Sequence, residues 1–236
     1  MDITTVNEII KLLEDYRDGE PRMDAKGFSD DGPVTPPERG KDTPKGTLAL
    51  LVGHSRVGDD GALAFDKTTT EWNYNRNLAH FITLYLNDHI NVTIIDSYKG
   101  SSYAEAMDNL KMVVDPLNAD LVLELHFNSF TNPTANGFEA LHWHSSSKGK
   151  NAAQHLCNSI ENAYPNNTNR GAKAILGRNE RGARFLRTLQ APCVILEPFF
   201  GSNEKEWHMF KTTEGKQQLA KAIATGVNKC FSHRRK

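Results

Sequence analysis

From residue 47 onward the chain alternates short apolar runs with amphipathic stretches, and this alternation restricts the folds it can adopt. Short apolar runs flanked by turn residues are typical of buried strands, whereas apolar residues spaced three or four apart are typical of helices. Alternating strands and helices predict an α/β fold, with a mostly parallel open sheet and helices on both faces. The predicted strands are 47–53, 92–97, 120–127, 137–143 and 192–200, and the predicted helices are 71–86, 103–114, 151–163 and 214–231.

The first 46 residues have a different character. Residues 5–16 carry a capping-box pattern at Thr5 and Glu8, followed by an apolar stripe, which predicts a helix. Residues 18–46 contain five prolines and five glycines among charged residues, which is typical of an irregular linker. We therefore expect an N-terminal helix plus linker over 1–46 and one domain over 47–236. The helix either docks on that domain or binds a partner or the cell wall.

Composition excludes several classes of protein. Lysine plus arginine number 28 and aspartate plus glutamate 29, so no strong positive field favours nucleic acid. No apolar run has the length of a membrane span, and the start lacks the pattern of a secretory signal. Three widely separated cysteines, Cys157, Cys193 and Cys230, indicate reduced thiols. We expect a monomer that is made in the cytoplasm without a signal peptide and does not insert into membranes.

Polar residues follow or end three of the predicted strands. His54 comes directly after 47–53, His126 lies near the end of 120–127, and Glu197 lies near the end of 192–200. Ligands of open α/β sheets bind beyond the carboxyl ends of the strands, so these side chains mark the expected site. Taken singly, each has an ordinary interpretation: a loop histidine, a hydrogen-bonded core histidine, and a buried carboxylate paired with Arg184 or Arg187.

Glu71 opens a predicted helix after threonines that can cap it. Acidic residues are common in a first helical turn, because they favour the helix dipole. However, Glu71 shares its helix face with the apolar residues Leu78 and Ile82, so we expect it to point inward at the end of the sheet. Two histidines and one carboxylate, here His54, Glu71 and His126, are a set that zinc binds while a position stays open for water. Glu197, flanked by apolar residues, is expected to have a raised pKa and to act as a general base.

Further polar residues surround these four. Glu124 and Asn128 share the strand face of His126, and we expect Glu124 to support that histidine rather than to add a fourth ligand, which would close the site to water. His142 and His144 flank Trp143 and are expected to line the groove or its rim; the alternative is a second metal site. Arginines recur at every third position, either as a solvated helical face or as a grip on the carboxylates of a peptide. These arginines are Arg178, Arg181, Arg184 and Arg187.

Residues 48–230 resemble the zinc-dependent N-acetylmuramoyl-L-alanine amidases, the amidase_3-type catalytic domain of bacterial autolysins and phage endolysins. The resemblance rests on segments that occur in the family's order: "GHS", "TTTEWNYNRNLA", "ADLVLELHFNSF", "NGFEALHW" and "LRTLQAPCVILEPFFGSNEKE". It implies that His54, Glu71 and His126 bind Zn²⁺ and that Glu197 is the catalytic residue. The chain departs from the family at Glu124, where a small hydroxyl residue is usual.

The resemblance implies a hydrolase that cuts the amide bond between N-acetylmuramic acid and L-alanine in peptidoglycan. Independently of the resemblance, the arginine spacing makes Arg181 and Arg184 candidates for supporting the site or binding the substrate. It further suggests a phage endolysin that reaches the cell wall, or the periplasm, after a separate pore-former opens the membrane. Two alternatives remain at this point. One is a zinc amidohydrolase or carboxypeptidase acting on a small acylated amino acid or peptide, and the other is a non-catalytic wall-binding protein.

Overall fold

A computed structural model describes residues 46–56 and 58–232 of the chain. The predicted helix at 5–16 and most of the predicted linker lie outside these residues, so the division at residue 46 stays a prediction. The described part forms a six-stranded sheet with the order β2-β1-β3-β6-β4-β5. The strands are β1 (Gly46–Val52), β2 (Ile90–Ile95), β3 (Leu121–Leu125), β4 (Phe138–Trp143), β5 (Asn169–Ile175) and β6 (Cys193–Glu197).

The sheet is mostly parallel, as the sequence predicts, but it contains one reversal. β1 pairs in parallel with β2 and β3, and β3 pairs in parallel with β6. β4 is antiparallel to β6 and parallel to β5, so β4 and β5 run opposite to the other four strands. The start of β4 therefore lies beside the carboxyl end of β6, where Glu139 pairs with Glu197.

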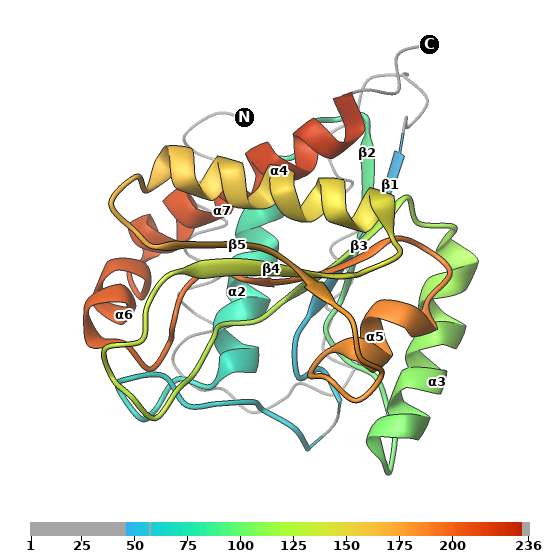
Figure 1. Ribbon diagram of the computed structural model, residues 1–236, viewed down its shortest axis with the longest axis horizontal. Coiled ribbons are helices and arrows are strands. Elements are labelled where there is room, and N and C mark those ends of the chain that lie inside the picture. Colours follow the sequence, from blue (N-terminus) through green and yellow to red (C-terminus); the bar gives the residue numbers. More distant parts are fainter. Residues whose placement is uncertain (1–45, 57, 233–236) are drawn as a thin grey trace, which may run out of the picture. The chain divides into compact units, whose positions relative to one another are not determined.

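Helices cover both faces of the sheet (Figure 1), which confirms the predicted fold class. The helices α2, α4 and α7 pack on one face, where α7 contacts both of the others. On the other face, α3 and α5 enclose a core that includes Leu51, Val122 and Ile195. The helices are α2 (Glu71–Thr83), α3 (Tyr103–Val114), α4 (Ser147–Ala163), α5 (Ala183–Thr188), α6 (Glu204–Phe210) and α7 (Thr213–Ser232), with a 3₁₀ turn at Asp115–Leu117.

Three elements were not expected from the sequence: β5, α5 and α6. β5 lies at the edge of the sheet and only its last residue, Ile175, is buried, so it lacks the apolar run of a central strand. α5 and α6 are six and seven residues long, too short to show a helical period clearly. None of the described helices combines the length and apolar character needed to cross a membrane.

Candidate metal centre and active site

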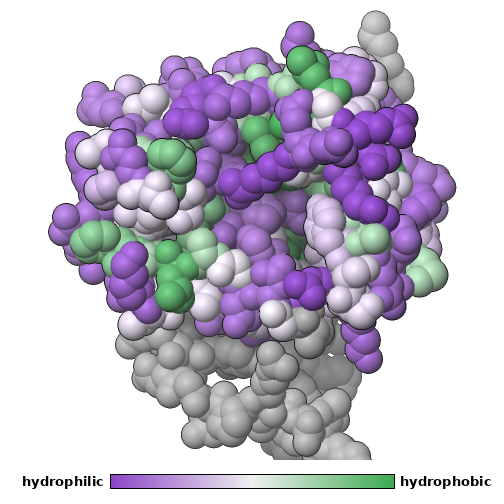
Figure 2. All heavy atoms as spheres, turned by 60° about the horizontal axis from the view of Figure 1, so that its bottom comes forward, coloured by the Kyte–Doolittle hydropathy of each residue, from purple (hydrophilic) through white to green (hydrophobic). Residues whose placement is uncertain are grey.

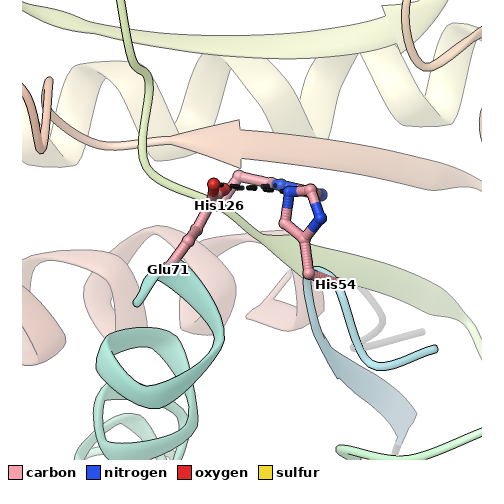
Figure 3. A group of neighbouring side chains, drawn as sticks. All are labelled: His54, Glu71 and His126. Atoms are coloured by element: carbon pink, nitrogen blue, oxygen red, sulfur yellow. Dashed lines mark hydrogen bonds and ion pairs between the residues drawn. The ribbon is translucent and has the colours of Figure 1, made fainter. Parts of the chain in front are cut away.

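The fold brings together the three residues that the sequence proposes as metal ligands (Figure 3). His54 follows β1, Glu71 is the first residue of α2, and His126 follows β3. One ligand atom from each residue lies within 4.8 Å of the others. The rings of His54 and His126 meet edge to face, with their centroids 5.0 Å apart. Three separate elements therefore converge at the carboxyl end of the sheet, as expected.

The turn after β1 depends on a close backbone approach. The Gly53 amide donates to the carbonyl oxygen of Leu125 at 2.7 Å. A Cβ added to Gly53 would lie 2.5 Å from that oxygen and 2.6 Å from Cε1 of His126, so no other residue fits without a shift. The left-handed backbone belongs to His54 itself, with φ of 60°. A left-handed residue other than glycine is an unusual conformation, of the kind found at functional sites.

Glu71 is almost fully buried and lies between the two histidines. Its Oε1 lies 2.8 Å from Nδ1 of His126 and accepts from the amide of Phe127 at 3.1 Å. Its Oε2 lies 3.3 Å from Nε2 of His54 and accepts from the amide of Ala62 at 3.2 Å. Burial alone would raise the pKa of Glu71, but the bonds to both histidines outweigh it and hold the pKa far below its usual range. Glu71 is therefore a carboxylate that faces inward, as expected.

Each histidine uses its other ring nitrogen to meet a further carboxylate. Nδ1 of His54 lies 2.9 Å from Asp59, and Nε2 of His126 lies 3.3 Å from Glu124. Burial by itself lowers the pKa of both imidazoles, but the surrounding carboxylates outweigh it and raise both pKa values. The pocket thus favours positive charge between the histidines and Glu71.

The donor set fits a zinc ion. Nε2 of His54, Nδ1 of His126 and the Glu71 carboxylate face one another, and zinc accepts such a set of two nitrogens and one oxygen. A histidine that binds a metal usually donates its other N–H to a carboxylate or carbonyl oxygen. Asp59 and Glu124 occupy those outer positions here. The sequence had not singled out Asp59, which lies five residues after His54 in a loop without periodic pattern.

A second glycine lets the loop before α2 cover this cluster. Gly61 has φ of +72°, and a Cβ added there would lie 2.6 Å from Cδ2 of His54 and 2.8 Å from Cβ of Glu71. At the start of α2, the side chain of Thr70 accepts from the amide of Asn73 and caps the helix. Bare backbone on one side and a capped helix on the other therefore fix the position of Glu71.

Glu197 ends β6 and is 1% exposed. Its Oε1 lies 3.0 Å from Nη2 of Arg181, whereas Oε2 has no hydrogen-bond partner among the described residues. Burial raises the pKa of Glu197, and the nearby His126 and Arg181 offset only part of this effect. The expected direction of the shift is confirmed, and the arginine beside it is Arg181 rather than Arg184 or Arg187. Such a carboxyl group is suited to accepting and returning a proton.

Asn128 does not contact the metal cluster formed by His54, Glu71 and His126. Its Nδ2 donates to Oε1 of Glu139 at 3.1 Å, and Arg170 and Lys173 each reach Oε2 of Glu139 at 2.6 Å. These ion pairs hold the pKa of the Glu139 carboxyl below its usual range, although burial opposes them. Glu139 pairs with Glu197 across the two strands. This group could not be predicted from the sequence, which does not reveal that β4 runs antiparallel to β6.

The same reversal corrects the expectation for His142. This histidine lies beside Val194, near the beginning of β6, and is therefore at the opposite end of the sheet from Glu197. Among the described residues that line the pocket beside the metal cluster, neither His142 nor His144 occurs. A strand parallel to β6 would have placed His142 and His144 at the rim of the groove, where the sequence analysis expects them.

The metal cluster and Glu197 open into one pocket with a volume of about 530 Å³. The face that carries it is hollowed and bordered by hydrophilic side chains (Figure 2). Glu124, Tyr98 and Tyr103 line the pocket near His126, and the arginines singled out in the sequence line it as well. Those arginines do not share one helix. Arg178 and Arg181 precede α5, and Arg184 and Arg187 lie on it.

A family model described as N-acetylmuramoyl-L-alanine amidase matches residues 48–229, which is most of the chain. The chain belongs to this family. Its hydrolase activity and its peptidoglycan substrate follow from that membership. A search of curated protein sequences found no match to the chain.

Solved structures with the same fold include several amidases. The CwlD amidase from Clostridioides difficile, solved in complex with the GerS lipoprotein, matches with a TM-score of 0.69 and 24% identity, covering 79% of this chain and 98% of that one. The catalytic domain of the amidase CwlV from Bacillus (Paenibacillus) polymyxa var. colistinus matches with a TM-score of 0.65 and 22% identity, covering 78% and 97%. The catalytic domain of CD27L, an endolysin targeting Clostridia difficile, matches with a TM-score of 0.64 and 25% identity, covering 77% and 96%.

Proposed function

We propose that this amidase depends on zinc and cuts the bond between the lactyl group of N-acetylmuramic acid and L-alanine in peptidoglycan. The observation that carries the proposal is the convergence of His54, Glu71 and His126 beside the pocket that also holds Glu197. A set of two imidazoles and one carboxylate leaves an open position on zinc, which is the arrangement of hydrolytic rather than structural sites.

His54, Glu71 and His126 would hold the ion, and Asp59 and Glu124 would fix the ring nitrogens that face it. When bound, zinc supplies a Lewis acid that polarises the amide carbonyl and lowers the pKa of the attacking water toward neutrality. Zn²⁺ is therefore the proposed cofactor.

Glu197 moves the proton. Its buried Oε2 has no hydrogen-bond partner among the described residues, so it is free to accept a proton from the attacking water. As the carbon–nitrogen bond breaks, Glu197 returns that proton to the leaving nitrogen, which becomes the amino terminus of L-alanine. Arg181 holds Oε1 of the same carboxylate at 3.0 Å and so orients it.

We further propose that the enzyme acts in host-cell lysis as a phage endolysin. The support is the likeness to the CD27L endolysin catalytic domain, which extends over 96% of that domain. Expression in bacteria with and without a separate pore-forming protein tests this role. We expect rapid lysis only with the pore-former. Lysis without it, or none with it despite active enzyme, would contradict the role.

The reaction is tested by mass spectrometry of digested cell-wall fragments, with zinc measured in the same purified protein. We expect free lactyl carboxylates on muramic acid, new amino termini on L-alanine, and about one zinc per chain. New termini elsewhere in the peptide would indicate a carboxypeptidase or another amidohydrolase. Wall binding without any new terminus would indicate a binding protein.

A further inference from the structure

One wall of the pocket beside the metal cluster is rich in arginine. The pocket extends from His126 and Glu197 to the loop 176–182 and the helix α5. Its volume of about 530 Å³ is within the range of roughly 300–1,000 Å³ that is usual for small-ligand sites. The described residues that line it include no lysine but five arginines: Arg56, Arg178, Arg181, Arg184 and Arg187.

Three of these arginines already interact with the protein. Arg181 lies 3.0 Å from Glu197, and Arg56 lies 3.7 Å from Asp59. Arg184 reaches a backbone carbonyl oxygen at 3.4 Å and a more distant, exposed carboxylate at 3.9 Å. These contacts occupy part of the hydrogen-bonding capacity of the three guanidinium groups.

Arg178 and Arg187 are different. Both are exposed, and within residues 46–56 and 58–232 neither has a carboxylate within the 4.0 Å that defines an ion pair. Glu180 also lines the pocket, but its carboxylate accepts a hydrogen bond from the Gly177 amide. Two guanidinium groups at this wall are therefore available to an anion that enters the pocket.

The chemistry of the substrate identifies that anion. N-acetylated sugars are neutral, and the lactyl carboxyl group is consumed in the amide bond that is cut. The free carboxylates of a muramyl peptide lie on the peptide, on the residues that follow L-alanine. Guanidinium groups match carboxylates with two parallel hydrogen bonds, which makes arginine the residue best suited to recognise them.

We propose that Arg178 and Arg187 form a subsite for a free carboxylate of the stem peptide, on the leaving side of the cut bond. This inference rests on the proposed amidase function. It places the peptide along α5 and the glycan on the opposite side of the metal cluster. It also predicts that amidation of the recognised carboxylate lowers kcat/KM, because amidation removes the charge at nearly constant size.

The test uses two pairs of synthetic muramyl peptides with their carboxyl termini blocked as amides. In one pair the second residue is D-isoglutamate or D-isoglutamine. In the other pair the second residue is D-isoglutamine in both peptides, and the side-chain carboxyl group of the third residue is either free or amidated. For the wild-type enzyme we expect kcat/KM to be at least about tenfold higher for the acid in one pair, as for a charged hydrogen bond. The pair that shows the difference identifies the carboxylate.

In the double variant Arg178→Gln plus Arg187→Gln, the ratio of kcat/KM for acid over amide should fall toward one. Replacing both by lysine should keep part of the ratio, since the charge remains while the fork geometry is lost. Lys221→Gln removes an exposed cation from α7, away from the pocket, and should leave the ratio unchanged. Melting temperatures identify any variant that does not fold.

A wild-type ratio near one in both pairs would overturn the subsite while leaving the amidase function intact. A ratio that survives in the folded double glutamine variant would overturn it as well. If the wild-type enzyme cuts none of the four peptides but cleaves another bond in the wall, the proposed function and the subsite both fail.

Discussion

The two sides of the pocket are built in opposite ways. On the side of β1, β3 and α2, the metal cluster is closely packed and each ionisable group meets an oppositely charged or hydrogen-bonding partner. On the side of α5, the arginines are long and partly or fully exposed, on a short helix and the loop before it. A closely packed set of ligands is suited to holding an ion, whereas an exposed charged wall is suited to selecting what approaches it. Substitutions on the first side should therefore have larger effects than those on the second.

The largest effect is expected from Glu71→Gln. The change removes the negative charge between two histidines, so we expect loss of stoichiometric zinc and of nearly all activity. Removing one member of a buried charged group also lowers the free energy of unfolding, by up to about 3–5 kcal/mol. Elemental analysis and a melting curve measure both effects, with Glu204→Gln on the exposed start of α6 as the control. Full zinc content in the variant would contradict the ligand role.

Glu197→Gln should abolish most of the turnover without affecting zinc binding. Because Glu197 is not in the ligand cluster, we expect the variant to bind zinc normally. Loss of the proton acceptor should reduce kcat by about 10²- to 10⁴-fold. Turnover near the wild-type level in a zinc-loaded variant would show that another group moves the proton.

A smaller effect is expected from Glu124→Gln. Nε2 of His126 lies 3.3 Å from this carboxylate, which fixes the nitrogen that faces Glu71. A weaker partner at this position should lower zinc affinity by about 10- to 100-fold. Competition with a zinc chelator measures it directly. Glu124→Ser, which restores the residue usual in the family, tests whether a hydroxyl group can replace the carboxylate. Unchanged affinity in both variants would remove Glu124 from the site.

The smallest effect is expected at the boundary between the two sides. Arg181 lowers the pKa of Glu197, so Arg181→Gln should raise that pKa further. A base must be deprotonated to act, so the acidic limb of the kcat/KM profile should move to higher pH. Because Arg181 is largely exposed, the loss on that limb should be only about twofold to fivefold. A limb that moves to lower pH, or a uniform loss at every pH, would contradict this assignment.

The metal side could be predicted from the sequence because its signals are strong and local. His54 and His126 follow apolar runs that are typical of buried strands, and Glu71 opens a well-patterned helix. The rule that ligands bind beyond the carboxyl ends of parallel strands then places them together. The close contact of Gly53 with Leu125 and His126 could not be predicted, because it depends on how β1 pairs with β3.

The other side could not be predicted, for two physical reasons. Alternation along a strand shows which face is buried but not the direction in which the strand runs, so the position of Glu139 beside Glu197 was hidden. The threefold spacing of the arginines resembled one helical face, but Gly182, with φ of +78°, divides them between a loop and α5. Only the three-dimensional structure shows that all four arginines line the same pocket.

The position of β3 between β1 and β6 has a consequence for how the chain folds. Leu51 pairs with Glu124, and Glu124 pairs with Ile195. A shift of one residue would turn every side chain of β3 to the opposite face and carry Glu124 and His126 away from His54 and Glu71. An ion that binds only the correct alignment adds its binding free energy to that alignment alone. The same metal that serves the reaction would thus stabilise the correct strand pairing. Chains with a misaligned β3 would be recognised as protein that does not bind zinc.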